Sequence, residues 1–274
     1  KHGPSTCASR LASGSRQLIV DAEQHFADHF GYESALFFSS GYQANCALLK
    51  TLLSSGDHVF FDKRIHASMV DGMRSTAAVF HGFRHADLDH LQKRLEETSC
   101  ELPFILVESL YSMDGDYLDC KRLERLKSQS QAVTIVDEAH AFGALGPLGR
   151  GIARTTATVA VGTFGKAFAF HGAFILCPRI IRDSIINFAS PFIFTTGTSV
   201  AHAAAASQIL DIVAGSDSLR DKLRILSSSL KEHLVQGGFS VHGDAHILAV
   251  QVGDETRATA YAAKLLSSGF HVLA

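Results

Sequence analysis

The sequence predicts an α/β fold built on a mostly parallel central sheet. Short apolar runs of strand character alternate with segments of helical period along most of the 274 residues. Such an alternation is typical of parallel strands joined by crossover helices. Hydrophobic residues make up 46% of the chain, which is enough to bury a sheet of this kind on both of its faces.

Seven segments have the apolar character of buried strands. They lie at residues 35–38, 58–62, 79–83, 103–108, 133–136, 158–161 and 173–177. Helices are expected at residues 18–30, 41–53, from about 66 onward, 87–97 and 119–128. Gly31 stands where a glycine C-cap would end the first helix, and Asp87 stands where an N-cap would begin the fourth.

The C-terminal part of the chain has a different organisation. Residues 200–236 are mainly helical in pattern, and a strand at 245–252 followed by a helix at 256–268 restarts the alternation. We therefore predict a large domain over residues 1–215 and the start of a smaller domain over residues 216–274. Neither end of the chain coincides with the end of an element, so we expect a part of a longer protein.

Charge and cysteine usage narrow the class of protein. The 25 Lys and Arg nearly balance the 27 Asp and Glu and form no basic stripe, so nucleic acid and anionic membranes are not expected partners. The five cysteines form no Cys-x-x-Cys pair and the fifteen histidines no metal-ligand spacing, so neither a disulfide framework nor a metal is expected. No apolar run is long enough to span a membrane, and we expect a cytoplasmic protein.

Two motifs carry the most specific chemistry. In residues 135–140 a buried strand ends at Asp137, and in residues 161–166 another strand leads into Lys166 next to Gly165. Pyridoxal 5'-phosphate (PLP) needs a carboxylate that keeps its pyridine nitrogen protonated and a lysine that binds its aldehyde. A glycine beside the lysine would let the planar cofactor approach closely. The two motifs therefore predict a PLP enzyme with Lys166 as the Schiff-base lysine.

The Asp-Glu-Ala-His sequence at residues 137–140 has an alternative interpretation. It is also the magnesium-binding box of one class of nucleic-acid-dependent ATPases, which requires a phosphate loop upstream. The sequence has no such loop, and residues 162–166 lie downstream of the box with the wrong spacing. Either motif alone could be a solvated strand end with an ordinary surface side chain, but their order and context favour the PLP site.

A site for the cofactor phosphate is predicted where a strand turns into a helix. Residues 39–45 contain Gly41 at such a turn, and the free N–H groups of a helix N-terminus suit an anion. The hydroxyl of Thr163 could reach the same phosphate. The simpler alternatives are an ordinary serine N-cap for the turn and a good β-former for the threonine.

Other candidates also lie at strand ends or helix starts. His66 opens a helix after a strand, so its ring could stack on the cofactor. Glu108 and Ser112 follow a buried strand, at the edge of the sheet where ligands bind in such folds. His140 could contact the phenolic oxygen of the cofactor or the substrate carboxylate. Taken singly, each histidine has a structural alternative, and residues 114–115 could be a simple turn.

Together the motifs resemble those of the α-oxoamine synthases, a family of fold-type-I PLP-dependent transferases. The resemblance runs along essentially the whole chain and rests on motifs at residues 39–45, 66–68, 112–116, 137–140 and 163–166. It implies a homodimer in which Lys166, His66 and Asp137 are catalytic. The implied cofactor-binding set is Gly41, Tyr42, His66, Glu108, Ser112, Asp137, Ala139, His140, Thr163 and Lys166, with Thr195 and Thr196 reaching the phosphate from the neighbouring subunit.

Within the family, the motifs are most similar to the members that join L-alanine to a pimeloyl thioester, with loss of carbon dioxide, in biotin biosynthesis. The implied partners are an amino acid and an acyl-coenzyme A or acyl-carrier-protein thioester. Gly41 and Tyr42 differ from the Cys-Phe pair typical of glycine-using members, and those members usually lack an acidic residue at Asp116. Glycine C-acetyltransferase, 5-aminolevulinate synthase and serine palmitoyltransferase types stay open, as does a non-catalytic partner subunit.

The chain departs from the family pattern at several places. Two arginines that contact substrate in the family, one near each end, lie outside this chain. Residues 154–161 are slightly short for the family. Ala169 and Phe170 stand where smaller residues are common. These differences leave the cofactor motifs in place and bear on the activity of the chain.

Overall fold

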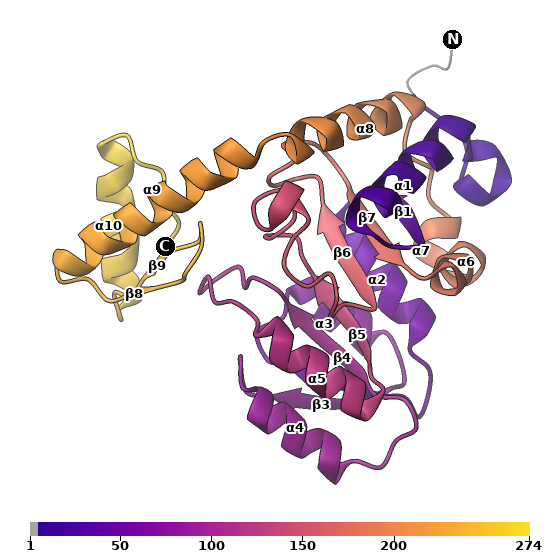
Figure 1. Cartoon of the computed structure of the whole chain (residues 1–274), viewed down its shortest axis with the longest axis horizontal. Helices are drawn as coiled ribbons and strands as arrows, with labels where there is room; N and C mark the ends of the chain where they lie inside the picture. The colour runs from indigo at the N-terminus through magenta and orange to yellow at the C-terminus, as the bar shows by residue number, and fades with distance from the viewer. Residues whose placement is uncertain (1–4) are drawn as a thin grey trace. The chain divides into compact units, whose positions relative to one another are not determined.

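The computed structural model describes residues 5–274, which divide into two compact units. The first unit runs to Tyr111 and continues over Tyr117–Arg220, and the second comprises Ser112–Asp116 and Asp221–Ala274. Figure 1 shows the elements of both units. The change of unit falls inside helix α9 (Asp217–Gln236). The predicted division at residue 216 stays a prediction.

The first unit is built on a seven-stranded sheet with the order β1-β7-β6-β5-β4-β2-β3 (Figure 1). Its strands are β1 (Ser34–Phe38), β2 (His58–Asp62), β3 (Val79–Phe83), β4 (Phe104–Glu108), β5 (Val133–Asp137), β6 (Val159–Thr163) and β7 (Ala173–Cys177). Only β7 runs antiparallel to its neighbours, β1 and β6, while the other pairings are parallel. The predicted α/β fold with a mostly parallel sheet is confirmed.

Helices cover both faces of this sheet, as an all-round apolar sheet requires. One face carries α1 (Gln17–Phe30), α4 (Leu88–Glu97), α5 (Cys120–Ser130) and α8 (Val200–Ala214). The other carries α2 (Gly41–Leu52), α3 (Ala67–Arg74), α6 (Arg179–Phe188) and α7 (Ser190–Ile193). Successive strand residues alternate between the two cores: Phe37 faces one and Phe38 the other, because side chains alternate along a strand.

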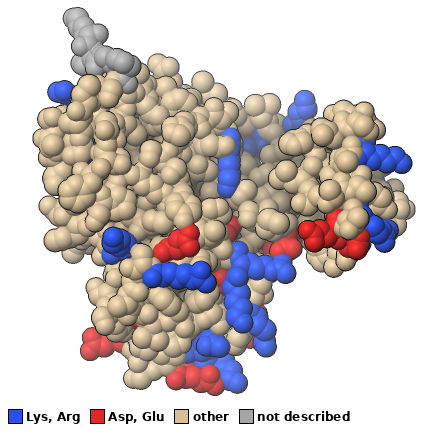
Figure 2. Space-filling view, turned by 180° about the vertical axis from the view of Figure 1, so that it is seen from behind, with Lys and Arg blue, Asp and Glu red and all other residues tan. Residues whose placement is uncertain are grey.

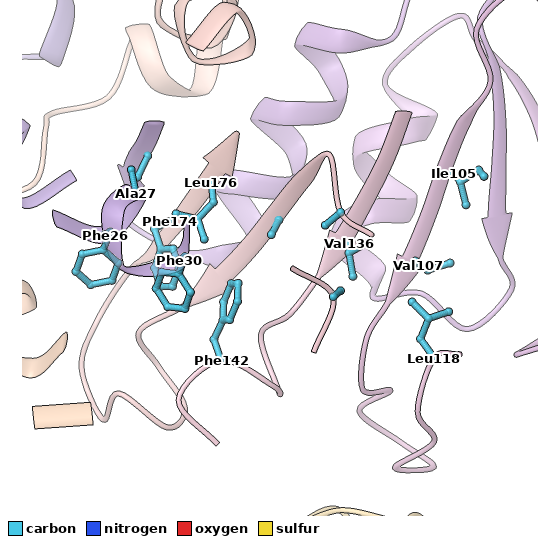
Figure 3. Close-up of a cluster of buried hydrophobic side chains, with 14 of the residues drawn as sticks. Phe26, Ala27, Phe30, Ile105, Val107, Leu118, Val136, Phe142, Phe174 and Leu176 are labelled. Atoms are coloured by element: carbon cyan, nitrogen blue, oxygen red, sulfur yellow. The ribbon is translucent and has the colours of Figure 1, made fainter. Parts of the chain in front are cut away.

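Phenylalanine side chains dominate the core beneath α1. Figure 3 shows Phe26 and Phe30 of α1 beside Phe142 and Phe174. The ring centroids of Phe26 and Phe174 are 4.9 Å apart, and those of Phe30 and Phe142 are 4.4 Å apart. Each buried ring contributes about 1.5–3 kcal/mol to the free energy of unfolding. Phe164, which begins the loop that carries Lys166, joins the same cluster at 5.3 Å from Phe26.

The helix ends follow the local signals in the sequence. Gly31 ends α1 in the left-handed conformation, with φ of 76°, and Asp87 caps α4 by accepting a hydrogen bond from the N–H of His90. Both predicted caps are confirmed. Helices α6 and α7, together with the short turns η1 (Arg10–Gly14) and η2 (Pro147–Gly149), were not expected from the sequence.

The second unit contains the rest of α9, a two-stranded ladder and a final helix. The ladder pairs β8 (Val241–His242) with β9 (Ala249–Val250), and α10 (Glu255–Ser267) follows. The predicted strand over residues 245–252 is therefore wrong in length. Gly243 adopts φ of 95° and starts a loop, so the extended backbone resumes only at β9.

Both signs of charge occur on the face of the molecule shown in Figure 2, with broad uncharged areas between them. Some basic side chains are paired with acidic neighbours, such as Arg84 with Asp87 at 2.7 Å. In the part of the chain that the structure describes, no helix combines the length and apolar character needed to cross a membrane.

Candidate active site

The strand register gathers several predicted residues at one edge of the sheet. Glu108 at the end of β4 is paired with Asp137 at the end of β5, and Asp137 is paired with Val161 of β6. Thr163 ends β6, and Lys166 follows three residues later. Because parallel strands end at the same edge, this is where a fold of this type binds its ligand.

Asp137 is held firmly and is only 7% exposed. Its Oδ1 accepts a hydrogen bond from the N–H of Ala139 at 2.9 Å, and its Oδ2 accepts one from Nδ2 of Asn45 at 2.9 Å. An ionised carboxylate has about four acceptor positions, so this group can still accept a hydrogen bond from a ligand N–H. The geometry suits the predicted role of Asp137 at the pyridine nitrogen, with Ala139 acting through its backbone.

Lys166 lies in the tight loop between β6 and β7. The surrounding protein lowers the pKa of its amine by desolvation, although the attraction of Asp137 and Glu108 acts in the opposite direction. A lowered pKa increases the neutral, nucleophilic fraction of a lysine. The loop itself is fixed by backbone hydrogen bonds from Ala169 to Lys166 and from Phe170 to Phe164.

The hydroxyl of Thr163 organises the start of this loop. It donates to the carbonyl of Gly172 and accepts from the N–H of Gly165, both at 3.1 Å. A Cβ atom added at Gly41 would meet only the Cβ of Thr163, at 4.0 Å. There is thus open space between the start of α2 and the end of β6, into which an anion could fit.

The N-terminus of α2 faces this space with free donors. Ser40 caps the helix by accepting a hydrogen bond from the N–H of Gln43 at 3.1 Å. Among the described residues, none accepts a hydrogen bond from the N–H groups of Gly41 and Tyr42. The ring of Tyr42 is half exposed, and its hydroxyl donates to Asp71 of α3. Any phosphate contact by Tyr42 would therefore use its backbone.

His66 is the N-cap of α3, as expected for a residue that opens a helix. Its Nδ1 lies 2.7 Å from Oγ of Ser68 and accepts from the N–H of Ser68 at 3.2 Å. The ring is otherwise exposed, so one edge is fixed and the face is left for a ligand.

The structure does not bring every predicted residue to this edge. Glu108 is buried there, and His140 lies half-buried in the turn after β5. Ser112 belongs to the second unit, so its contact with the cofactor stays a prediction. Thr195 and Thr196 lie between α7 and α8, where Thr196 pairs with Ser9. No hydrogen bond joins either threonine to the strand ends in the described structure, and their role across a dimer stays a prediction.

Three buried residues that surround the site were assigned no role from the sequence pattern. Asn45 and Ser68 stand inside recognised motifs, yet only the structure reveals their contacts with Asp137 and His66. Glu138 follows Asp137 and is 1% exposed. Desolvation raises the pKa of its carboxyl to about 7 even though it accepts hydrogen bonds from Ser109 and the backbone. Burial of these polar side chains cannot be inferred from an apolar pattern.

The site fits PLP in its chemistry. A buried carboxylate lies at one strand end, a lysine of lowered pKa follows the next strand, and two free amides with open space beside them suit a phosphate. The residues that would hold the cofactor come from the first unit alone, Ser112 excepted.

Comparisons with known proteins agree with this geometry. The 8-amino-7-oxononanoate synthase of Chlorobaculum parvum is 35% identical over 273 residues, which cover 97% of this chain and 70% of that protein. A serine palmitoyltransferase from S. paucimobilis, solved with PLP and myriocin bound, superposes with a TM-score of 0.94 at 29% identity, over 100% of this chain and 73% of that one. The 8-amino-7-oxononanoate synthase of Francisella tularensis superposes with a TM-score of 0.85 at 29% identity. The match covers 94% of this chain and 78% of that one.

A mostly parallel sheet with these groups at its carboxyl edge is the architecture of fold-type-I PLP-dependent transferases. The family described as aminotransferase class I and II matches residues 5–274. The chain belongs to this family and, within it, to the α-oxoamine synthases, which are PLP-dependent acyltransferases.

Proposed function

We propose that this chain catalyses the decarboxylative condensation of L-alanine with a pimeloyl thioester to give 8-amino-7-oxononanoate, a step of biotin biosynthesis. The observation that carries the proposal is the position of Asp137 at the end of β5 and of Lys166 just after the end of the adjacent strand β6, where the Asp137 carboxylate acts on the pKa of the lysine. The choice of reaction within the family is supported by relatives of that name, such as the protein of Chlorobaculum parvum.

In this proposal, Lys166, Asp137, His66 and the start of α2 hold the cofactor. Lys166 would bind its aldehyde, Asp137 its pyridine nitrogen, and the N–H groups of Gly41 and Tyr42 its phosphate. Bound PLP would supply an electron sink for the negative charge that develops at Cα of the amino acid.

The side chains of the site would then orient the substrate and move protons. The neutral amine of Lys166 would take the proton from Cα of alanine and return one to the same carbon after carbon dioxide is lost. Asp137 would keep the hydrogen bond that stabilises positive charge on the ring nitrogen. His66 would cover the ring and limit the access of water, and His140 would orient the substrate carboxylate or the phenolic oxygen.

Further parts of the proposal concern assembly and location. We propose a homodimer in which Thr195 and Thr196 reach the phosphate of the partner's site. This is supported by the pairing of Thr196 with Ser9 and by the lack of any described hydrogen bond from either threonine to its own strand ends. The acyl donor would be an acyl-coenzyme A or an acyl-carrier protein, and the enzyme would act in the cytoplasm.

A serine palmitoyltransferase type of reaction is the second candidate. It is favoured by the TM-score of 0.94 with a serine palmitoyltransferase. The two candidates differ in both the amino acid and the acyl chain, so one substrate matrix separates them.

The test uses the purified protein with PLP. L-alanine, glycine and L-serine are each paired with pimeloyl-, acetyl-, succinyl- and palmitoyl-coenzyme A, and thiol release is followed with product mass. Fastest turnover of alanine with pimeloyl-coenzyme A is expected. Preference for serine with the palmitoyl thioester would transfer the assignment to the second candidate, and a PLP-bound protein that turns over no pair would favour a non-catalytic subunit. Lys166→Ala should strongly reduce turnover of every pair. Lys50→Ala is its control, because Lys50 is an exposed lysine on α2.

A further inference from the structure

A continuous chain of hydrogen bonds joins Asp137 to His66 through two buried residues of the first unit. Asn45 of α2 is 1% exposed, and its Nδ2 lies 2.9 Å from Oδ2 of Asp137 and 2.9 Å from Oγ of Ser68. Ser68 is fully buried at the start of α3, and its Oγ lies 2.7 Å from Nδ1 of His66. The two residues that would contact the ring nitrogen and the ring face of the cofactor are thus connected inside the protein.

The direction of every bond in this chain follows from the carboxylate. A carboxylate only accepts, so the amide nitrogen of Asn45, not its oxygen, must face Asp137. The same nitrogen faces Ser68, so both of its hydrogens are used and Oγ of Ser68 must accept. The hydroxyl proton of Ser68 is then left for Nδ1 of His66, which also receives the N–H of Ser68 at 3.2 Å. With Nδ1 as an acceptor, the ring proton is placed on Nε2.

We propose that Asn45 and Ser68 are positioning residues through which Asp137 fixes the tautomer and orientation of His66. Asn45 and Ser68 would touch neither cofactor nor substrate. They would act by presenting His66 with Nδ1 turned into the protein and Nε2–H turned outward. The proposal rests on the proposed function only in taking Asp137 and His66 as cofactor contacts.

The state of Asn45 argues for orientation over simple packing. Its Oδ1 is buried and has no hydrogen-bond partner in the described structure. A buried acceptor without a partner lowers the free energy of unfolding, so an apolar side chain of the same size would pack at a smaller cost. Unlike an apolar side chain, the amide holds two N–H groups in fixed directions, and these donate to Asp137 and Ser68.

The first experiment requires no cofactor. The protein is labelled with ¹⁵N-histidine, and the His66 ring nitrogens are assigned by comparison with His66→Gln. We expect an Nε2–H ring with Nδ1 shifted by hydrogen bonding. In Ser68→Ala the hydroxyl is lost, and only the longer hydrogen bond from the backbone N–H of residue 68 to Nδ1 is left. The Nδ1 resonance should therefore move toward that of an unbonded nitrogen, and Ser68→Thr should restore the wild-type resonance. A His66 ring protonated at Nδ1 in the wild type would overturn the proposal.

Asn45→Leu tests whether the series of hydrogen bonds that orients His66 starts at Asp137. In this variant the Ser68 hydroxyl is present but no longer receives the hydrogen bond that orients it. The His66 Nδ1 resonance should therefore move part of the way toward its position in Ser68→Ala, while Thr51→Ala should leave it unchanged. Thr51 is a matched control because it lies on the same helix and its hydroxyl donates to the carbonyl of Ala47, outside the hydrogen bonds that join Asp137 to His66. An Asn45→Leu spectrum identical to the wild type would exclude transmission from Asp137. If Asn45→Leu does not fold, the comparison of Ser68→Ala with Ser68→Thr still decides whether Ser68 positions His66.

A second readout separates this inference from the proposed function. With PLP, Ser68→Ala should keep the visible band of the lysine-bound cofactor and lose about 10-fold in kcat, with KM little changed, because misplacing a contact group slows chemistry more than binding. Ser68→Thr should recover most of the loss. A wild-type protein without the band would refute the proposed function while the ¹⁵N result stands. A Ser68→Ala enzyme with wild-type kcat and spectrum would refute the positioning role.

Discussion

Gly41 and Thr163 face each other across a small open space, since a Cβ atom on Gly41 would lie 4.0 Å from the Cβ of Thr163 and meet nothing else within that distance. The two residues lie 122 positions apart in the sequence, at the start of α2 and the end of β6. The space between them is where we place the cofactor phosphate.

Gly41→Val should separate cofactor binding from folding. Its branched side chain would fill the space beside Thr163 without a clash against the backbone, so the free energy of unfolding should change by less than about 1 kcal/mol. The Kd for PLP should rise at least about 10-fold because the anion loses its place. Equilibrium titration of PLP and urea unfolding measure the two effects.

Gly151→Ala is the matched contrast, because its effect should be on folding. Gly151 adopts φ of 73°, and an added Cβ would lie 2.6 Å from Oε2 of Glu138. A left-handed alanine costs about 1–2 kcal/mol, to which the contact adds. If Gly151→Ala unfolded at the wild-type urea concentration, the tight packing around Glu138 would be refuted.

Lys166→Ala should abolish covalent cofactor binding and reduce turnover by roughly 10³-fold or more, because one side chain serves as both the carrier and the proton-transfer group. Borohydride reduction of the PLP-treated protein, followed by peptide mapping, should place the pyridoxyl group on Lys166 in the wild type. A label on another lysine would contradict the site.

Asp137→Asn should lower the pKa of Lys166 further. Attraction to the Asp137 carboxylate opposes the effect of burial on that pKa, so its removal leaves desolvation less compensated. The pH at which the apo-protein reaches half its maximal rate of reaction with PLP should therefore fall. An unchanged midpoint would mean that the two groups do not interact.

Glu138 should make stability depend on pH in a recognisable direction. Its carboxyl has a pKa of about 7 in the folded protein against an ordinary 4.5, so between these values the folded state binds more protons than the unfolded state. The contribution of Glu138 to the free energy of unfolding should therefore decline as the pH rises from about 4.5 to about 7, by on the order of 3 kcal/mol.

Urea unfolding of the wild type and Glu138→Gln between pH 5 and pH 8 checks this expectation. The advantage of the wild type over the variant should shrink as the pH rises. Glu101→Gln, at an exposed position, should show a constant difference. A wild-type advantage that grows with pH would contradict the raised pKa.

Arg10 and Glu23 form a buried pair whose disruption should be costly. Their side chains meet through two hydrogen bonds of 2.6 and 2.9 Å, and Glu23 also accepts from the N–H of Phe37. Glu23→Ala leaves a buried cation and should lower the free energy of unfolding by about 3–5 kcal/mol. The double variant Arg10→Met/Glu23→Leu should lose less than the single one, which urea denaturation can test.

The fold was accessible from the sequence because its signals are local. Each strand is a short apolar run, and caps such as Gly31 and Asp87 mark helix ends by residue type. The site was accessible only in part. Asp137, Lys166 and Gly41 stand next to strand or helix ends and could be found by position, whereas the links of Asn45 to Asp137 and Ser68 bring together residues 92 and 23 positions apart. No local pattern encodes such contacts.

The C-terminal strand and helices α6 and α7 show a second limit. The pattern over residues 245–252 is strand-like, but Gly243 and Ile247 lie against Gly115, and most of the segment forms a loop. Tertiary context therefore overrides local preference where a segment is short. Helix α7 has a proline at its second position, which is a typical start signal for a helix, but the helix is too short for an apolar periodicity to reveal it.

The pairing of β1 with β7 has a consequence for the order in which the molecule can assemble. β1 is an edge strand whose partner in the described sheet is β7, and the hydroxyl of Ser34 reaches the carbonyl of Cys177, 143 residues later. During synthesis, β1 can pack against α1 and α2 early, but it must wait for β7 before it gains a strand partner. The turn after β1, which we propose binds the phosphate, is thus completed late, together with the loop of Lys166. A nascent chain stopped before residue 177 would therefore expose an unpaired apolar strand edge to chaperones.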